Sequence, residues 1–403
     1  MKKCILLISA VFPPEPVVSA MLSYDIAMKL CSIGCKVVVV SPKPTRPLNY
    51  VFPKGHPKYP FEHYVLNSYT CPESRIIGRT RESISFGKAI TKFISEYPEK
   101  IECIYANTWA LFSQLALAQI AKKKRIPYII HVQDVYPESY CFKLPKIAGY
   151  ILYRLLIPID KYVHKNAVRI IGISPTMIDY LSITRKTDRC KYVLARNWQN
   201  DQTFINAYKP IEEKAKRDFH LMYLGSINPT ANVALVLKSL GKIQDANIHL
   251  SIVGNGPEKD NCQVLAKELG LDVSFDVVTP ERVAEKQSEA DVLMLCLKNG
   301  VAKTATPSKL TAYMLTGRPI IASVDLDSDC AQIIYEANCG LVVPPDDIVS
   351  LSKAISEMSL KTRDQLNNLG AAAFEYAKKH LSKDVNLNIV TKTICEIKYN
   401  QNE

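Results

Sequence analysis

Short apolar runs alternate along this chain with longer segments whose apolar residues recur at helical spacing. Cys4–Ala10 and Lys36–Val40 are apolar or β-branched almost throughout, as in strands that are buried on both faces. Between them, Ser19–Ile33 carries apolar residues at helical spacing and stops at Gly34, which predicts a helix. The alternation continues in both halves of the chain, and it predicts parallel sheets with helices on both faces.

The same alternation of apolar runs and helical spacing predicts the other elements. Further strands are predicted at Ile104–Ala106, Tyr128–Val132, Val168–Ile173, Leu221–Leu224, His249–Val253, Val273–Val277, Asp291–Leu297, Ile320–Ser323 and Gly340–Val343. Further helices are predicted over Trp109–Lys124, after Ser174-Pro175, from Asn228 to Leu240, from Pro257, and over Thr306–Gly317. The segment Lys43–Ile84 is rich in Pro, Tyr and Arg and longer than a usual connection, so we expect a functional loop region there.

The length and the spacing of these elements predict two doubly wound α/β domains. A chain of 403 residues is too long for one core, and the pattern pauses in the polar stretch Arg196–Lys216. We expect one Rossmann-like domain over residues 1–198, a second over 199–375, and a C-terminal helix in 376–403 that packs back toward the first domain. Ligands of such sheets bind at the carboxyl ends of strands, so the turns there are the candidate sites.

The net charge of +12 calls for a partner or ligand of opposite charge. Nucleic acid, an anionic membrane surface and a phosphate-bearing substrate all fit, although the basic residues are not interleaved with aromatic ones as in a nucleic-acid stacking platform. The twelve cysteines are dispersed without metal-ligand spacing, which favours reduced core residues in the cytoplasm and no metal site. The apolar stretch Ile147–Ile159 is interrupted by Arg154 and Pro158 and is too short to span a bilayer.

Three turns of the C-terminal half place small residues between a strand and a predicted helix start. Glycine lets a ligand approach the backbone, a helix start supplies N–H donors, and Lys309 adds a positive charge. Three such turns on one domain favour a phosphate or diphosphate ligand, and ordinary tight turns are the alternative. The candidate binding residues are Gly225, Ser226, Asn228, Gly254, Asn255, Gly256, Thr306, Ser308, Lys309 and Leu310.

The turn after the first strand, Val11–Ala20, is a candidate wall of a cleft because its three prolines stiffen it. Glu15 could contact a substrate hydroxyl or be a solvated loop residue, and Pro16 and Ser19 follow it. The turn lacks Gly-x-Gly-x-x-Gly, so a nicotinamide or flavin cofactor is disfavoured.

A second candidate follows the strand Tyr128–Val132. His131 and Asp134 lie at the carboxyl end of this strand, where they could supply a general base or hold a substrate hydroxyl. The alternative for His131 is a core histidine with its hydrogen bonds satisfied.

Taken together, these segments resemble the family-four glycosyltransferases of the GT-B fold. The resemblance is greatest to the bacterial branch that builds capsule, O-antigen or colanic-acid-like polysaccharides, and it covers nearly the whole chain. The segments that carry it are Phe12–Ala20, His131–Ser139, Arg196–Trp198, Gly254–Pro257 and Pro307–Ala322.

The resemblance implies two Rossmann-like domains that face each other across a cleft, an N-terminal one for the acceptor and a C-terminal one for a nucleotide sugar. It implies retaining transfer of a hexosyl or N-acetylhexosaminyl unit, usually from a UDP-sugar, to a glycan or polyprenyl-diphosphate-linked acceptor. No metal or other cofactor is expected, so the amides of Ser308 and Lys309, the Lys309 ammonium and Arg196 would neutralise the diphosphate. Asp134 and His131 would then be catalytic.

The chain also departs from the family pattern. Thr304 and Ala312 stand where many members carry two glutamates, the second of which holds the donor ribose. The Arg and Lys that usually follow the Gly225 turn are also absent, and Ser226 and the Asn228–Asn232 stretch stand in their place. These changes keep open a nucleotide-sugar epimerase or hydrolase on the same fold, and a degenerate transferase that acts as an assembly subunit. A nucleic-acid binder is the weakest alternative.

The lipid-linked acceptors of this branch give the basic charge a further interpretation. Lys143–Lys165 combines apolar and cationic residues in the manner of a helix that lies in a membrane interface. A packed helix with a solvated basic edge is the alternative. We therefore expect a cytoplasmic protein with peripheral contact to the inner face of an anionic membrane.

Overall fold

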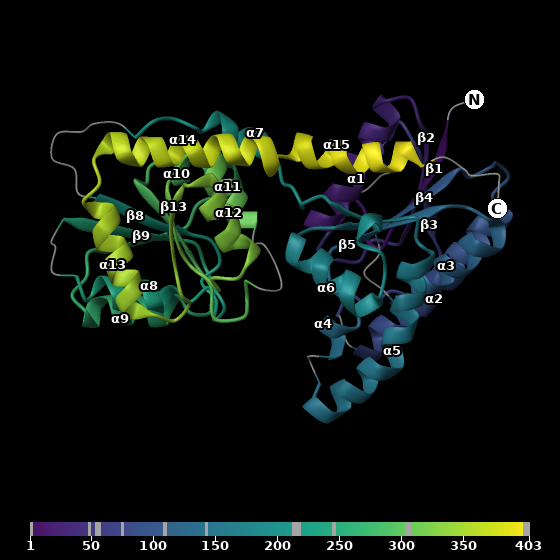
Figure 1. Cartoon of the computed structure of the whole chain (residues 1–403), viewed down its shortest axis with the longest axis horizontal. Helices are drawn as coiled ribbons and strands as arrows, with labels where there is room; N and C mark the ends of the chain where they lie inside the picture. The colour runs from purple at the N-terminus through teal and green to yellow at the C-terminus, as the bar shows by residue number, and fades with distance from the viewer. Residues whose placement is uncertain are drawn as a thin grey trace. The chain divides into compact units, whose positions relative to one another are not determined.

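Two parallel sheets organise the chain, one in each of two compact units (Figure 1). The computed structural model describes residues 3–46, 50–52, 58–73, 76–107, 111–141, 144–211, 219–243, 247–302 and 308–397. Unit 1 comprises Met1–Asn197 with Asn386–Glu403, and unit 2 comprises Trp198–Val385. The two sheets confirm the predicted fold class of two doubly wound domains.

The described part of unit 1 contains a seven-stranded sheet in the order β3-β2-β1-β4-β5-β6-β7, with every pairing parallel. Its central strands are buried along their whole length because they carry apolar side chains on both faces. The strands are β1 (Cys4–Ser9), β2 (Lys36–Pro42), β3 (Glu62–Leu66), β4 (Cys103–Asn107), β5 (Tyr128–Val132), β6 (Arg169–Gly172) and β7 (Tyr192–Leu194).

The helices of unit 1 are α1 (Val18–Ser32), α2 (Ile76–Glu96), α3 (Leu111–Lys124), α4 (Glu138–Cys141), α5 (Lys146–Asn166) and α6 (Pro175–Arg185), and a 3-10 turn follows at Arg189–Lys191. Ser174 caps α6, since its hydroxyl accepts a hydrogen bond from the Met177 amide at 3.1 Å. The prediction that Lys43–Ile84 is a loop region was wrong in part, because β3 and the first residues of α2 lie within it.

The last helix, α15 (Lys383–Glu396), runs from unit 2 into unit 1. The Lys3 ammonium donates to the carbonyls of Ile394 and Cys395, at 3.2 and 2.9 Å. A cation at a helix C-terminus satisfies carbonyls that have no partner within the helix, so these bonds tie the end of α15 to the start of β1.

The described part of unit 2 contains a six-stranded parallel sheet in the order β10-β9-β8-β11-β12-β13. Its strands are β8 (Phe219–Leu224), β9 (Ile248–Val253), β10 (Val273–Asp276), β11 (Val292–Cys296), β12 (Ile320–Ser323) and β13 (Gly340–Val343). Its helices are α7 (Asp201–Asn206), α8 (Val233–Leu240), α9 (Lys259–Glu268), α10 (Val283–Gln287), α11 (Ser308–Leu315), α12 (Asp329–Ala337), α13 (Ile348–Ser359) and α14 (Arg363–His380), with a 3-10 turn at Pro280–Arg282.

Two helices of unit 2 begin later than their sequence predicts. Asn228 was expected to open α8, but its side-chain oxygen instead accepts hydrogen bonds from the amides of Thr230 and Ala231, both at 3.0 Å. This side-chain turn competes with the first helical turn, and α8 starts at Val233. In the same way α9 starts at Lys259 rather than at Pro257.

The strand orders place one switch point in each sheet, between β1 and β4 in unit 1 and between β8 and β11 in unit 2. At a switch point the connections leave the two strands toward opposite faces, which opens a crevice at the carboxyl ends. The turn at Gly225 follows β8, and the segment that leads to α11 follows β11. The candidate residues of the C-terminal half therefore gather around one switch point.

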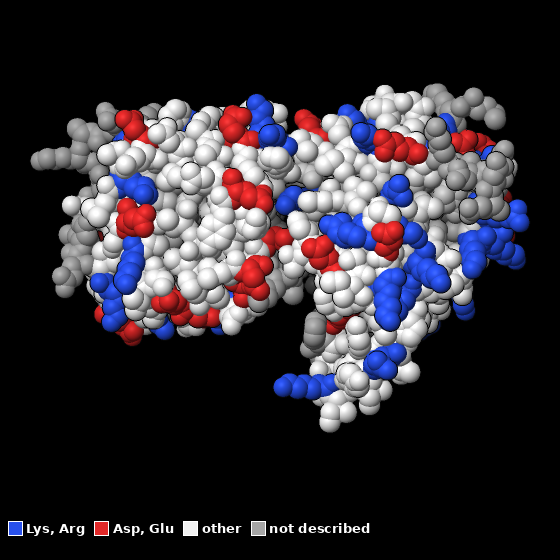
Figure 2. Space-filling model, viewed as in Figure 1, with Lys and Arg blue, Asp and Glu red and all other residues white. Residues whose placement is uncertain are grey.

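Helix α5 is buried mainly along its second half, although Gly149 in the first half packs against the Cys141 carbonyl. Its buried residues include Ile157, Asp160 and Val163, whereas the first half exposes Ile147, Tyr150, Ile151 and Leu155 by 55 to 79%. Figure 2 shows Lys and Arg in excess of acidic residues over the α3 and α5 side of unit 1 in this view. The helix thus exposes an apolar surface (Ile147, Tyr150, Ile151 and Leu155) next to a basic one.

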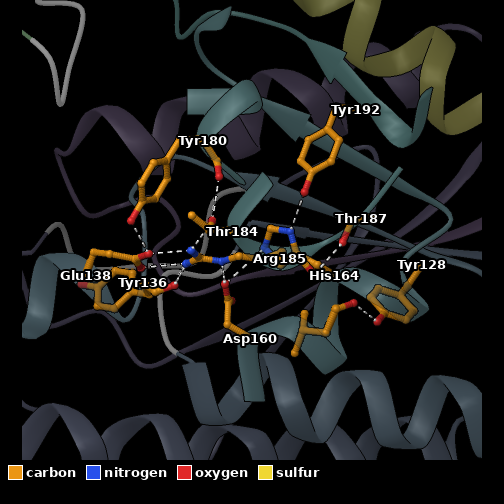
Figure 3. A network of polar contacts seen from close by, with 11 residues as sticks. Tyr128, Tyr136, Glu138, Asp160, His164, Tyr180, Thr184, Arg185, Thr187 and Tyr192 are labelled. Carbon is orange, nitrogen blue, oxygen red and sulfur yellow. Dashed lines mark hydrogen bonds and ion pairs between the residues drawn. The ribbon is translucent and has the colours of Figure 1, made fainter. Parts of the chain in front are cut away.

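A buried ionic cluster joins α4, α5 and α6 (Figure 3). The Arg185 guanidinium donates to both oxygens of Glu138, at 2.5 and 2.7 Å, and to Asp160 Oδ2 at 2.6 Å. It also donates to the Tyr136 carbonyl at 2.7 Å. Burial raises the pKa of Glu138, but the Arg185 contacts outweigh it and leave that pKa lowered. Arg185 therefore fastens the segment after β5 to two helices.

We predict that Arg185→Met lowers the free energy of unfolding by about 3–5 kcal/mol, because it leaves two carboxylates buried without their cation. Urea unfolding followed by circular dichroism measures the loss. The deficit should be smaller at acidic pH, since protonation neutralises carboxylates whose folded-state pKa the substitution has raised.

Arg189→Met is the matched control. Arg189 pairs with Asp179 at 2.8 Å, but both side chains are more than half exposed, so its loss should cost about 0.5 kcal/mol or less. Equal losses for the two variants would show that the cluster does not stabilise unit 1.

Candidate functional site

A lysine for which no carboxylate partner is found among the described residues lies at the switch point of unit 2. Lys309 stands in the first turn of α11, and its ammonium donates to the Tyr223 hydroxyl at 2.7 Å and lies 4.6 Å from the centre of that ring. Burial lowers the pKa of Lys309 to about 8. No ion pair to Lys309 is found among the described residues. A desolvated ammonium next to an aromatic ring favours an anionic ligand, which restores the charge partner that the fold omits.

Gly225 makes room for this lysine. Its backbone has a φ of 143°, which side-chain-bearing residues rarely adopt, and a Cβ there would collide with the Lys309 side chain. The absence of a side chain therefore lets the Lys309 ammonium lie directly against the turn after β8. Lys309 thus contributes a cation at the turn after β8.

The turns after β8 and β9 fit against each other. A Cβ on Gly254 would overlap the Gly225 carbonyl, and the amide of Ile227 donates to the Asn255 carbonyl at 2.9 Å. Gly256 lies equally close to Ile227. This backbone contact explains the glycines at both turns.

The same contacts correct one expectation about these turns. The amides of Gly225, Gly254 and Gly256 are already donors, to the Val253 carbonyl, the Asp276 carbonyl and the Asn255 side chain. Both helices begin some residues later, so the turns do not offer a helix N-terminus to a ligand. The two turns pack against each other. The groups that could bind an anionic ligand here are therefore the Lys309 ammonium, as the cation, and the start of α11, as the source of N–H donors.

The remaining residues at α11 are placed as follows. Ser308 is exposed at the first position of the helix, whereas the Leu310 side chain is fully buried, so only its amide could face a ligand. Ala312 is buried and carries no group that could bind a ribose. Thr306 and Thr304 lie outside the described residues.

Arg196 belongs to unit 1, just after β7. Its amide donates to the Asn386 side-chain oxygen at 2.8 Å, and its buried Nε has no hydrogen-bond partner among the described residues. A cationic donor in this state is suited to an anionic ligand.

His131 lies at the end of β5 and is 1% exposed. Its Nδ1 is 2.6 Å from the Tyr105 hydroxyl, and its Nε2 has no partner within the described ranges. Burial lowers the pKa of His131 to about 4, so the ring is neutral at physiological pH. So low a pKa makes the ring a weak base, and the role of His131 as a general base stays a prediction. Among the described residues only Nδ1 of the ring has a hydrogen-bond partner, so the alternative of a core histidine with both nitrogens satisfied is not met within these ranges.

The carboxylates that follow His131 have separate positions. Asp134 is exposed between β5 and α4, and the His131 ring bonds to Tyr105 rather than to it. Glu138 is buried and held by Arg185, as described above. Asp134 is thus the carboxylate of this segment that is open to solvent.

Glu15 is not the solvated residue that the sequence suggested as an alternative. It is 3% exposed, and its Oε1 accepts from the amides of Thr45 and Arg46 at 2.7 and 2.9 Å. Burial raises its pKa. Glu15 therefore fastens the connection after β2, while Pro16 is exposed and Ser19 is half-buried beside it.

Sequence reasoning missed three residues that these sites depend on, namely Tyr223, Tyr105 and Arg185. Each of the two tyrosines lies within a largely buried strand, and a buried tyrosine hydroxyl nearly always has a partner. A tyrosine in a predicted buried strand therefore indicates a buried hydrogen bond, but the sequence does not identify the residue to which the hydroxyl bonds.

Neither a metal-binding cluster nor a membrane-spanning helix is found among the described residues. In the part of the chain that the structure describes, no three His, Cys, Asp or Glu side chains come close enough together to hold a metal ion. Across the described ranges, no helix has the length and apolar character needed to cross a bilayer.

Comparisons with known proteins agree with this architecture. The model of the family "Glycosyltransferase Family 4" matches residues 20–198, and that of "Glycosyl transferases group 1" matches residues 204–376. The probable glycosyltransferase WbjE of Pseudomonas aeruginosa is 24% identical over 273 residues, which are 64% of this chain and 66% of that protein. The match thus spans just under two thirds of this curated relative.

Solved structures share the fold over nearly the full length. A glycosyltransferase from Rickettsia africae ESF-5 gives a TM-score of 0.69 at 14% identity, covering 98% of this chain and 100% of that chain. Anabaena Alr3699/HepE in complex with UDP gives 0.68 at 13% identity, with the same coverage. With family 4 and group 1 domains on two such sheets, the chain belongs to the glycosyltransferases of the GT-B type.

Proposed function

We propose that this glycosyltransferase moves a sugar from a UDP-sugar to a glycan or polyprenyl-diphosphate-linked acceptor in cell-surface polysaccharide synthesis. The transfer retains the anomeric configuration and uses no metal ion. The observation that carries the proposal is the Lys309 ammonium, which lies at the switch point of unit 2 beside Tyr223 and has no carboxylate partner in the part of the chain that the structure describes. The names of two similar proteins support the donor and the class: Alr3699/HepE was solved with UDP, and WbjE is a probable glycosyltransferase.

The diphosphate is held without a metal by two kinds of group in unit 2. The Lys309 ammonium supplies the charge, and the amides at the start of α11, which have no partner within the helix itself, supply directed donors. As the bond to the sugar breaks, the leaving UDP gains negative charge, and a fixed cation in a dry site stabilises that charge more than the ground state. Lys309 is thus the main electrostatic group of the reaction.

The acceptor is bound on unit 1, near Asp134 and the turn of Pro16 and Ser19. Asp134 is a solvent-accessible carboxylate that can accept a hydrogen bond from the acceptor hydroxyl. The neutral His131 contributes a polar contact to the sugar or the acceptor.

A lipid-linked acceptor would bring the enzyme to an anionic membrane surface. The exposed apolar surface of α5 with its neighbouring cations fits the interfacial region, where apolar side chains enter the headgroup layer and Lys and Arg meet anionic lipid. We therefore propose peripheral attachment through α5.

The absence of a glutamate that would bind the donor ribose at position 312 favours one alternative function. This is a degenerate transferase that binds nucleotide without turnover. Ala312 is buried, so the usual carboxylate is absent from this position. An epimerase or hydrolase would instead consume the nucleotide sugar without any acceptor. Incubation of UDP-sugars with and without a membrane extract, followed by product chromatography, separates the three cases.

We predict that Lys309→Ala weakens UDP-glucose binding by roughly tenfold to a hundredfold, because a charge-assisted contact contributes about 1.5–3 kcal/mol. Isothermal titration calorimetry measures the affinity. In the wild type the affinity should hold below pH 8 and fall about tenfold by pH 9, since the free lysine loses its proton with a pKa near 8.

Lys309→Arg is the control for this prediction. A guanidinium stays charged throughout this range, so its affinity should not depend on pH. Unchanged affinity in Lys309→Ala would place the diphosphate elsewhere.

We predict that Asp134→Asn preserves UDP-glucose affinity but lowers the transfer rate by about a hundredfold or more, because the amide cannot accept the acceptor proton. Radiolabel transfer to a membrane extract measures the rate. Equal loss of donor affinity and rate would make Asp134 a structural residue.

We predict that Leu155→Glu on α5 weakens sedimentation with phosphatidylglycerol vesicles by at least about tenfold, since it removes apolar burial and adds repulsion. Leu360→Glu is the matched control, because Leu360 is 80% exposed but lies on unit 2. Its binding should equal that of the wild type, and a similar loss in both variants would argue against attachment through α5.

A further inference from the structure

Tyr105 and His131 form an isolated hydrogen-bonded pair in the core of unit 1. They lie on the adjacent parallel strands β4 and β5, where Tyr105 is opposite Ile129 and His131 is the next residue on that face of β5. This diagonal position brings the Tyr105 hydroxyl to 2.6 Å from His131 Nδ1, with the rings edge to face. Both side chains are excluded from solvent.

The direction of the hydrogen bond between Tyr105 and His131 follows from the number of protons that the two side chains carry. If Tyr105 donates to Nδ1, the imidazole proton is on Nε2, and only that N–H lacks a partner among the described residues. If Nδ1–H donates to the phenol instead, both the phenol hydrogen and the Nε2 lone pair are left without partners. An unsatisfied buried donor costs about 1–3 kcal/mol, so the first arrangement is the more stable one.

The charge states agree with this direction. Complete burial raises the pKa of Tyr105 well above its usual value and lowers that of His131 to about 4. The phenol therefore keeps its hydrogen, and the imidazole keeps a lone pair to receive it. An ionised pair would place charge in an apolar core without compensation.

We propose that Tyr105 is a positioning residue that fixes His131 in the Nε2–H tautomer, so that the ring offers a hydrogen-bond donor, not a base, to an oxygen atom of the substrate. The Nε2–H is a buried donor without a partner among the described residues, and a sugar hydroxyl, a ring oxygen or a phosphate oxygen satisfies it. The identity of that oxygen rests on the proposed glycosyl transfer, whereas the tautomer does not.

The tautomer is read directly in the ligand-free protein by nitrogen NMR of the histidine-labelled chain, which has seven histidines. We expect the Nδ1 of His131 to resonate as a bare ring nitrogen and Nε2 as a protonated one. The opposite pattern would overturn the proposal. The variant His131→Asn assigns the signals, and single replacement of the other histidines assigns them if that variant does not fold.

Tyr105→Phe removes the hydroxyl that donates to Nδ1, so the two tautomers of His131 should exchange. The nitrogen chemical shifts of Nδ1 and Nε2 should then become more alike. Tyr128→Phe is the matched control, because Tyr128 is also a buried strand tyrosine with one hydrogen bond, to the Val163 carbonyl at 2.6 Å. It should leave both nitrogens of His131 unchanged. Identical spectra for wild type and Tyr105→Phe would contradict the role of Tyr105.

A double-mutant cycle connects the tautomer to turnover. We expect Tyr105→Phe to lower kcat/KM of transfer by roughly 5- to 30-fold in the wild type and to have no further effect in a His131→Ala background. Additive losses would mean that Tyr105 does not act through His131. Absence of any transfer would refute the proposed function and leave the NMR result valid.

Discussion

The parallel direction of every strand pairing is the constraint on which the sites of this protein depend. Because all strands of a sheet run the same way, all their carboxyl ends meet at one edge, and segments far apart in sequence end beside each other. Gly225, Gly254 and Lys309 become neighbours for this reason, whereas Tyr105 and His131 meet through the register of the adjacent strands β4 and β5. The apolar residues that form the strands thus determine where the polar residues meet.

At the switch point of unit 2, burial of the Lys309 ammonium destabilises the ligand-free protein. Keeping the Lys309 ammonium charged beside Tyr223 rather than in water costs roughly 3 kcal/mol, judged from its lowered pKa. An acidic side chain would remove that cost, and none pairs with Lys309 among the described residues. A site that is strained in the free state and relieved by an anion is typical of binding sites whose electrostatics are preorganised.

Unit 1 contains buried polar groups of two kinds, and their hydrogen bonding distinguishes them. Arg185 is completely surrounded by carboxylates and a carbonyl, so it fastens α4, α5 and α6 without need of a ligand. His131 is equally buried but has one nitrogen without a partner in the described chain. Satisfied buried groups stabilise a fold, whereas an unsatisfied donor beside a strand end points to a ligand.

The sequence by itself determined the fold class and most strands, because these depend on local patterns of apolar residues and glycine. The anion site that it places at the start of α11 stays a prediction. The sequence could not determine that the Asn228 side chain delays the start of α8, or that Glu15 is buried. Nor could it determine that the amides of the glycine turns already donate to other protein oxygens. It also could not pair Lys309 with Tyr223 or Tyr105 with His131. Such pairings depend on which strands lie side by side and in which register, and only the tertiary structure decides that.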